Sequence, residues 1–300
     1  MREETIKMTN LATVHQLSKK LEKNQVLTDV SCTFEKDMIY GLLGRNGAGK
    51  TTLLNLIAGK SLPDSGSIEV NGHKPFNHFD TLNQICFIRE SKNFKPTLTI
   101  KDILKMMPAF YPNWSSEKAL ELLELFELPH HKKVAQLSKG MESALGITVG
   151  ISSRAPLTIF DEPYIGMDAH AREEFYNALL EDYTEHPRTI ILSTHLIDEV
   201  SDLFQEIYFM KKGQISMHET INNLQERAFM ITGPKDTIES LSSQGRVLDR
   251  SSFMGDHSVT LYVDEDQLQT FHIPANCTRQ KIPLQQLMVY LTNHKEESFT

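Results

Sequence analysis

A glycine-rich segment that ends in a lysine and two threonines carries the clearest chemical pattern in the sequence. It fits the spacing G-x-x-x-x-G-K-[ST] and lies between an apolar run and a helical one. Glycines let successive backbone N–H groups approach a polyphosphate closely. Lys50 is expected to reach the β- and γ-phosphates, and the Thr51 hydroxyl to hold Mg²⁺. The expected nucleotide-binding residues are Gly44, Arg45, Asn46, Gly47, Ala48, Gly49, Lys50, Thr51 and Thr52. The alternative is a glycine-rich turn that merely contains a lysine.

Two adjacent acids follow an apolar run later in the chain. Asp161 and Glu162 come directly after residues 157–160. A strand that ends in carboxylates places them at the carboxyl edge of a parallel sheet, where ligands of such sheets bind. Asp161 suits a Mg²⁺ shell, and Glu162 suits a general base that polarises an attacking water. A pair of solvated acids at a strand end is the alternative.

His195 follows a third apolar run, residues 189–192. At the carboxyl end of a strand, it could contact a γ-phosphate and order the attacking water. Taken alone it could equally be an ordinary surface residue or the start of a helix. The catalytic interpretation of His195 therefore depends on the phosphate loop and the two acids.

These side chains converge only if several parallel strands end beside one another. The expected strands and helices alternate along the first two-thirds of the chain. Nearly continuous apolar runs are typical of strands covered on both faces. The pattern predicts an α/β fold, a P-loop NTPase core with a parallel sheet. The expected strands are 26–34, 38–43, 67–70, 157–160 and 189–192, and the expected core helices are 50–58 and 169–183.

A helical subdomain and a small C-terminal appendage complete the expected organisation. Residues 92–155 are helical in texture, and Ser115 opens a helix with Leu120, Leu123 and Phe126 on one face. Lys212–Gly213 is expected to form a hairpin turn. We expect a large domain over 1–224 and an α+β accessory domain over 225–300.

Composition limits the partners and the cellular compartment that we expect for the chain. The 300 residues are 40% hydrophobic and 23% charged, with a net charge of −8, which disfavours nucleic acid as a partner. The three cysteines form no CxxC pair and fit a reducing cytosol. The N-terminus is polar, and no run approaches the ~20 apolar residues of a spanning helix. We therefore expect a cytoplasmic chain that does not cross a membrane.

Together these residues resemble the ATP-binding cassette of ABC transporters over residues 14–217. Leu137-Ser138-Lys139-Gly140-Met141 is similar to the family signature LSGGQ, and Gly166-Met167-Asp168 to its D-loop. The resemblance implies an ABC ATP-binding domain over 1–224 that uses ATP and Mg²⁺. Glu162 and His195 would be catalytic.

The resemblance also implies partners. Two cassettes, in a homodimer or a heterodimer, would sandwich two ATP molecules, and Ser138, Lys139 and Gly140 would meet the partner's nucleotide in trans. A transmembrane permease subunit would hold the chain at the inner face of the cell membrane. The LSKGM variant and the appendage look like bacterial exporters of amphipathic compounds such as antimicrobial peptides or drugs. Alternatives are a soluble ABC ATPase that drives a non-transport assembly task, and a module that senses ATP without hydrolysis.

Three parts of the sequence depart from the family pattern. The signature has Lys139 for a glycine and Met141 for a glutamine. Glu90 stands where the family has a loop glutamine. Its carboxylate could coordinate Mg²⁺, or it could face solvent or the permease. Leu21 stands near the place of an aromatic residue that stacks on adenine. The first two departures bear on the rate of hydrolysis, and the third bears on selectivity for the base.

Overall fold

The computed structural model describes residues 10–253 and 256–293, so most of the polar N-terminal stretch lies outside the described residues. The chain forms two compact units, which are described separately. One holds residues 1–195 and 203–218, and the other holds 196–202 and 219–300. The expected division at 224–225 stays a prediction, although the last crossing between the units lies between His218 and Glu219.

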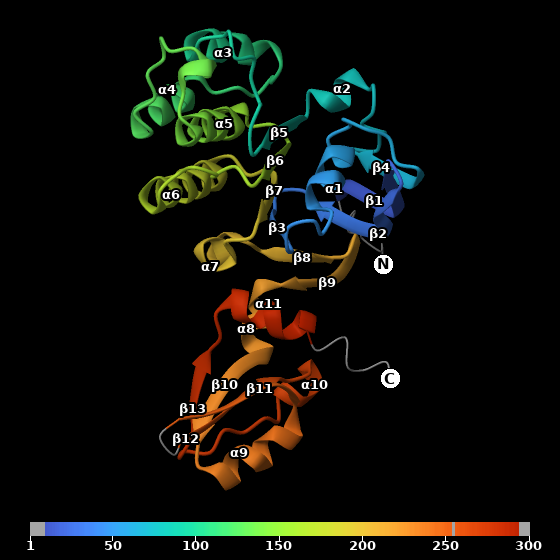
Figure 1. Cartoon of the computed structure of the whole chain (residues 1–300), viewed down its shortest axis with the longest axis vertical. Helices are drawn as coiled ribbons and strands as arrows, with labels where there is room; N and C mark the ends of the chain where they lie inside the picture. Colours follow the sequence, from blue (N-terminus) through green and yellow to red (C-terminus); the bar gives the residue numbers. More distant parts are fainter. Residues whose placement is uncertain (1–9, 254–255, 294–300) are drawn as a thin grey trace, which may run out of the picture. The chain divides into compact units, whose positions relative to one another are not determined.

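A six-stranded sheet forms the centre of the first unit (Figure 1). In spatial order its strands are β5 (Ile85–Arg89), β6 (Leu157–Asp161), β7 (Thr189–Thr194), β3 (Ile39–Leu43), β8 (Glu206–Lys211) and β9 (Gln214–Thr220). The pairs from β5 to β8 are parallel. Every residue of β3, β6 and β7 is buried, which explains the nearly continuous apolar runs within them. The predicted parallel α/β core is confirmed.

An antiparallel sheet and a first helix pack into the same core. The sheet has the order β2 (Asn24–Glu35), β1 (Asn10–Leu21), β4 (Ser65–Val70), and the helices that follow β3 and β4 are α1 (Lys50–Ile57) and α2 (Phe79–Leu82). Phe34, Tyr40 and Tyr208 meet between the two sheets, with Phe34 5.0 Å and 5.3 Å from the other two ring centroids. The predicted hairpin at Lys212–Gly213 is confirmed, because both residues have the positive φ of a two-residue turn between β8 and β9.

The helical subdomain contains α3 (Ile100–Met106), α4 (Ser116–Leu125) and α5 (Lys139–Ser153), drawn in green in Figure 1. Ser115 caps α4 as expected, since its hydroxyl accepts from the Lys118 backbone N–H. The expected apolar face of α4 is confirmed at Leu123, which is buried, but is wrong at Leu120, which is 59% exposed. The helix also buries Ala119 and Leu122. Leucines occupy both sides of this short helix, so their spacing alone does not identify the buried side.

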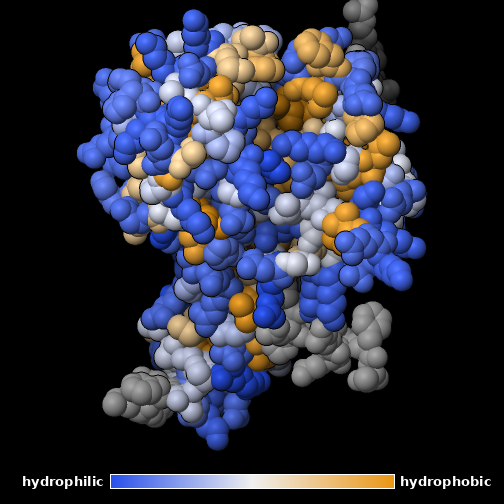
Figure 2. Space-filling view, turned by 45° about the horizontal axis from the view of Figure 1, so that its top comes forward, coloured by the Kyte–Doolittle hydropathy of each residue, from blue (hydrophilic) through white to orange (hydrophobic). Residues whose placement is uncertain are grey.

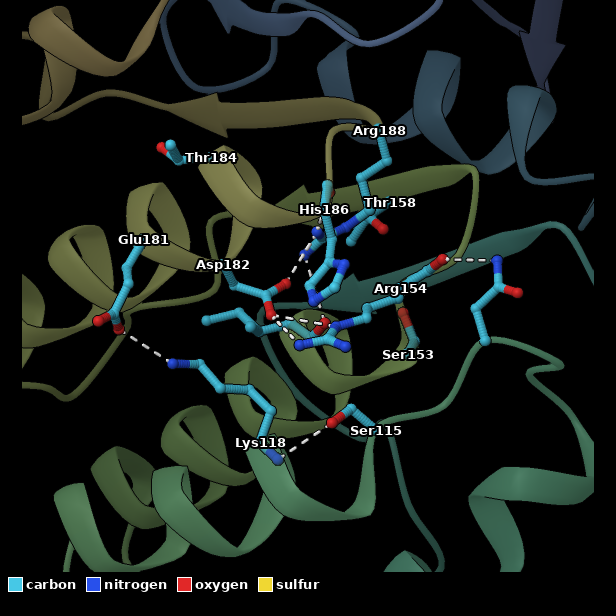
Figure 3. Close-up of polar contacts among 12 residues, drawn as sticks. Ser115, Lys118, Ser153, Arg154, Thr158, Glu181, Asp182, Thr184, His186 and Arg188 are labelled. Atoms are coloured by element: carbon cyan, nitrogen blue, oxygen red, sulfur yellow. Dashed lines mark hydrogen bonds and ion pairs between the residues drawn. The ribbon is translucent and has the colours of Figure 1, made fainter.

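A buried cluster of charges ties α5 to α6 (Ala169–Glu185) and to the start of β7 (Figure 3). Asp182 is 1% exposed and accepts from Arg154 at 2.8 Å, while Arg188 lies 2.9 Å from its other oxygen. Arg188 is itself 3% exposed. At the edge of the cluster, Lys118 of α4 pairs with Glu181 at 3.0 Å. These contacts fix three elements of the first unit at the end of the sheet from which β7 starts.

The second unit is a four-stranded antiparallel sheet with the order β11, β12, β10, β13. Its first strand lies in the middle beside the third, which is the split βαβ arrangement of ferredoxin-like folds. Phe229, Ile231, Ile238 and Leu261 form its core on the α9 side. The expected α+β character is confirmed. Its elements are α7 (Ile197–Val200), α8 (Ile221–Arg227), β10 (Ala228–Gly233), α9 (Lys235–Leu241), β11 (Arg246–Phe253), β12 (Asp256–Tyr262), α10 (Glu265–Leu268), β13 (Thr278–Lys281) and α11 (Leu284–Asn293).

Candidate nucleotide-binding and hydrolysis site

The phosphate loop is the turn that joins β3 to α1. Gly44, Gly47 and Gly49 all have positive φ, at 150°, 81° and 105°. A Cβ at Gly44 would also lie 2.5 Å from the backbone carbonyl oxygen of Met210, which cannot move aside without displacing β8. Glycine is therefore required there by both space and backbone angle. The loop stands at the N-terminus of an eight-residue helix, where free N–H groups and the helix dipole favour an anion.

Lys50 lies beneath this loop with 6% of its surface exposed. Its Nζ donates to the Gly44 carbonyl oxygen at 2.7 Å and lies 3.5 Å from Oε1 of Glu162. A buried ammonium group needs such partners, because an unpaired charge away from water is costly. Phosphate oxygens would offer Lys50 a stronger, charge-assisted set of acceptors in the same place.

Asp161 ends β6 and is 3% exposed. Burial raises its pKa above the ordinary value, and the Glu162 charge adds to this rise, while the neighbouring Thr51 and Ser193 hydroxyls and the charge of Lys50 oppose it. Its Oδ1 is buried and has no hydrogen-bond partner within residues 10–253 and 256–293. An orphaned carboxylate oxygen beside a threonine at the head of α1 is suited to a cation.

The residues present fit Mg²⁺. This ion usually takes one or two carboxylates and completes its octahedron with water and substrate phosphates. Asp161 would supply the carboxylate and Thr51 the hydroxyl. In the described part of the chain no group of three or more His, Cys, Asp or Glu residues could hold a metal by itself. The donor set therefore suits a metal that arrives with a nucleotide.

Glu162 follows Asp161 with a left-handed backbone, φ 49°. Its N–H donates to the carbonyl oxygen of Ser193 at 3.1 Å, which turns the side chain toward the end of β7. There Oε2 lies 2.7 Å from Nδ1 of His195 and accepts from the Tyr164 hydroxyl at 2.5 Å. The two predicted catalytic residues are thus in direct contact, although they are separated by 33 residues in the sequence.

A cleft of about 340 Å³ brings most of the predicted nucleotide-binding and catalytic residues together, whereas Gly44, Arg45 and Asp161 are not among the residues that line it. Glu90, exposed just after β5, lies on its wall, as do Glu162 and His195. Leu21 is 49% exposed at the end of β1 and is not among the residues that line the cleft. Those residues are Val26, Asn46, Gly47, Ala48, Gly49, Lys50, Thr51, Thr52, Glu90, Glu162, Ile165 and His195.

Sequence reasoning missed Val26, Ile165 and Tyr164. Val26 and Ile165 are apolar residues without a motif, and only the fold brings them to the cleft. Tyr164 carried one signal that could have identified it. It lies two residues after Glu162, in the turn that directly follows the buried strand β6.

The signature segment forms a separate surface. Ser138 caps α5 by accepting from the Met141 N–H at 3.2 Å. A Cβ on Gly140 would lie 2.5 Å from the carbonyl oxygen of Gly166, so α5 begins in close backbone contact with the segment before Asp168. Ser138, Gly140 and Asp168 line a pocket of about 490 Å³, whereas the phosphate loop lines the other cleft. Within one chain, these two groups of residues do not share a cleft.

Comparison with known proteins gives a consistent result. The family profile described as ABC transporter matches residues 27–165, and a profile of an AAA domain matches residues 133–202. The ABC transporter ATP-binding protein YtrB of Bacillus subtilis (strain 168) is 31% identical over 229 residues, which is 76% of this chain and 78% of YtrB. The bacitracin transport ATP-binding protein BcrA of Bacillus licheniformis is 29% identical over 223 residues, 73% of each chain.

A solved structure described as an ATP binding subunit of an ABC transporter agrees in fold. It superposes with a TM-score of 0.65 at 26% identity, over 72% of this chain and 92% of that one. Among the residues that the structure describes, no helix has the length and apolar character needed to span a bilayer. The family profile covers both the phosphate loop and the Asp161-Glu162 pair, the match to YtrB extends over 76% of the chain, and the fold agrees. The chain therefore belongs to the ATP-binding proteins of ABC transporters, and it is an ABC-type ATPase.

Proposed function

We propose that this chain binds ATP with Mg²⁺ and hydrolyses it to power a separate membrane permease. Lys50 would bind the β- and γ-phosphates, while Thr51 and Asp161 would hold the metal. Glu162 would accept a proton from the attacking water, and His195 would contact the γ-phosphate. The observation that carries the proposal is the contact of Glu162 with both Lys50 and His195 at the rim of one cleft.

Two cassettes are proposed to act together, since the signature residues lie apart from the phosphate loop of their own chain. Ser138, Lys139 and Gly140 at the N-terminus of the 15-residue helix α5 suit a γ-phosphate supplied by a partner cassette. Asp168 would accompany them across the interface. The partner is either a second copy or a related chain.

The permease is proposed to dock on the helical subdomain. Met106 and Phe110 are 43% and 50% exposed there, and exposed apolar side chains are favoured interface anchors. Figure 2 shows such apolar patches between hydrophilic areas on the face drawn. Trp114 is half-buried, and its Nε1 donates to Ser116, so Phe110 is the better anchor candidate. Docking of this kind would place the chain at the cytoplasmic face of the membrane.

An amphipathic compound, such as an antimicrobial peptide or a drug, is the proposed cargo, exported from the cell. Support for this comes from the likeness to a protein named for the transport of bacitracin. The cargo would contact the permease, so the identity of the cargo is tested on the complex of this chain with its permease.

The permease partner itself is tested by co-purification. Gentle solubilisation of membranes should recover this chain with a multi-span protein, and recovery only in a soluble complex would contradict the transport function.

Replacement of the proposed base tests hydrolysis directly. Glu162→Gln should retain MgATP binding and lose at least about a hundredfold in turnover, because the amide cannot take the proton of water. Glu69→Gln, an exposed strand position, is the matched control and should behave as wild type. Wild-type turnover of Glu162→Gln would show that another group is the base.

A further inference from the structure

The hydroxyl of Tyr164 connects the ends of two strands inside the site. The side chain is 3% exposed, and its oxygen lies 2.5 Å from Oε2 of Glu162 and 2.5 Å from Oγ1 of Thr194. The backbone N–H of His195 also points to this oxygen, at 3.4 Å. One buried phenol therefore contacts the proposed base, the residue before the catalytic histidine, and the backbone of that histidine.

The direction of these hydrogen bonds follows from the proton count. An ionised carboxylate can only accept, so Tyr164 donates its single proton to Glu162. The Thr194 hydroxyl then donates to the phenol oxygen. Burial raises the pKa of Tyr164, and the charge of Glu162 raises it further. The phenol thus keeps its proton over the whole range of pH in which the enzyme would act.

The two oxygens of Glu162 consequently have different surroundings. Oε2 receives the bonds of Tyr164 and His195. Oε1 is buried, has no hydrogen-bond partner among the described residues, and lies 3.5 Å from Lys50 Nζ beside the phosphate loop. A carboxylate free to rotate would exchange these positions. Tyr164 opposes that rotation because it is held from its other side by Thr194.

We propose that Tyr164 is a positioning residue for hydrolysis, which fixes Oε2 of Glu162 so that Oε1 faces the attacking water. The inference rests on the proposed function of Glu162 as the base. In the step it serves, water gives a proton to Oε1 and its oxygen bonds to the γ-phosphorus. The bond from that phosphorus to the bridging oxygen breaks, and the electron pair leaves with ADP. Tyr164 keeps its own proton throughout.

Tyr164→Phe tests the proposal because it removes the hydroxyl and keeps the ring. It should lower kcat by about tenfold or more and leave KM for ATP within about twofold, since orientation is lost and binding is not. The matched control is Tyr208→Phe, which removes an equally buried hydroxyl that donates to the Thr33 carbonyl oxygen at 2.6 Å. The control should keep the wild-type kcat. A wild-type kcat for Tyr164→Phe, or an equal loss in the control, would overturn the proposal.

A double variant separates this proposal from the proposed function. If Tyr164 acts through Glu162, adding Tyr164→Phe to Glu162→Gln should not change the residual single-turnover rate. A further tenfold loss in the double variant would overturn the positioning role, while wild-type turnover in Glu162→Gln alone would overturn the base assignment itself. Should Tyr164→Phe not fold, Thr194→Val repeats the test by removing the hydroxyl that donates to the Tyr164 oxygen, and it should lower kcat in the same way. Thr194→Ser should then restore kcat, and failure of that rescue would count against the proposal.

Discussion

At the residue scale, the site is organised around the left-handed backbone of Glu162. A non-glycine residue in that conformation is uncommon, and such residues gather at functional sites. The consequence here is that one carboxylate faces Lys50 on one side and His195 on the other. An arriving phosphate would compete with Glu162 for Lys50. ATP binding would therefore release Oε1 from its ion pair and leave it for the attacking water.

The first prediction at this scale concerns Glu90. Its exposed carboxylate lies on the same cleft as Glu162, so it adds negative charge near the place of the phosphates. Glu90→Gln should bind metal-free ATP severalfold more tightly, because like charges repel less, and its gain in affinity from added Mg²⁺ should be smaller. Titrating ATP at several Mg²⁺ concentrations measures both effects, with Glu69→Gln as the control. Curves that coincide with those of wild type would remove Glu90 from the metal shell.

At the element scale, the buried charges around Asp182 fix the relation of α5, α6 and β7 (Figure 3). Removing one partner of a buried ion pair leaves the other charge uncompensated. Asp182→Asn should therefore lower the free energy of unfolding by about 3–5 kcal/mol. Urea denaturation measures this. Glu181→Gln, whose carboxylate is 65% exposed in its pair with Lys118, should cost well under 1 kcal/mol. Equal losses in the two variants would contradict a special role for the buried cluster.

Elements that are buried on both faces were the ones that could be predicted from the sequence. β3, β6 and β7 contain nearly continuous apolar runs, and the acids and the histidine at the ends of β6 and β7 were predicted with them. β13 reads Thr-Arg-Gln-Lys, is fully exposed, and is a strand only because it pairs with β10. The contact of Tyr164 with Glu162 could not be predicted from the sequence either. It depends on the φ of Glu162 and on the pairing of Asp161 with Ser193, which no local pattern encodes.

The signature segment also belongs to this scale. Lys139 is the first residue of α5 and is exposed. The side chain of Met141 offers no hydrogen-bond donor where the family has glutamine. Loss of one donor to transition-state charge typically costs ~10²–10³ in rate. Lys139→Gly combined with Met141→Gln should therefore raise the ATPase rate of the assembled transporter by about tenfold or more. In a homodimer both sites should gain, and in a heterodimer only the partner's site.

The control for the signature variant is Lys95→Gly, an exposed loop position in the same subdomain, which should not change the rate. If the double variant is no faster than wild type, LSKGM is already fully competent. Unequal hydrolysis across the two sites would then have to arise elsewhere.

At the scale of the whole molecule, the two units share the chain in an unusual way. The chain leaves the first unit after His195, spends residues 196–202 in the second, and then returns to β8. Within the second unit, Asp198 of α7 accepts at 2.8 Å from the N–H of Gln285 in the first turn of α11. The side chain of residue 198 thus caps a helix that lies near the C-terminal end of the sequence.

Removal of this cap gives the prediction at the largest scale. Asp198→Ala should destabilise the second unit by about 1 kcal/mol, as loss of an N-terminal helix cap usually does. Hydrogen exchange should show faster opening of α11 in the full chain. Asp266→Ala, an exposed position in α10, is the control. Unchanged protection of α11 would show that Asp198 does not act as a cap.

The excursion of residues 196–202 has a thermodynamic consequence for regulation. Because α7 packs with α11 in one unit and only Leu196 separates it from His195 in the other, order in α7 would restrict the backbone freedom of the histidine. Linkage between two such equilibria is reciprocal. Any effector that stiffens the C-terminal unit must alter the affinity for nucleotide by the same factor by which nucleotide alters the affinity for that effector. Thermal unfolding of the C-terminal unit, followed with and without MgATP, would therefore report the size of this coupling before any effector is known.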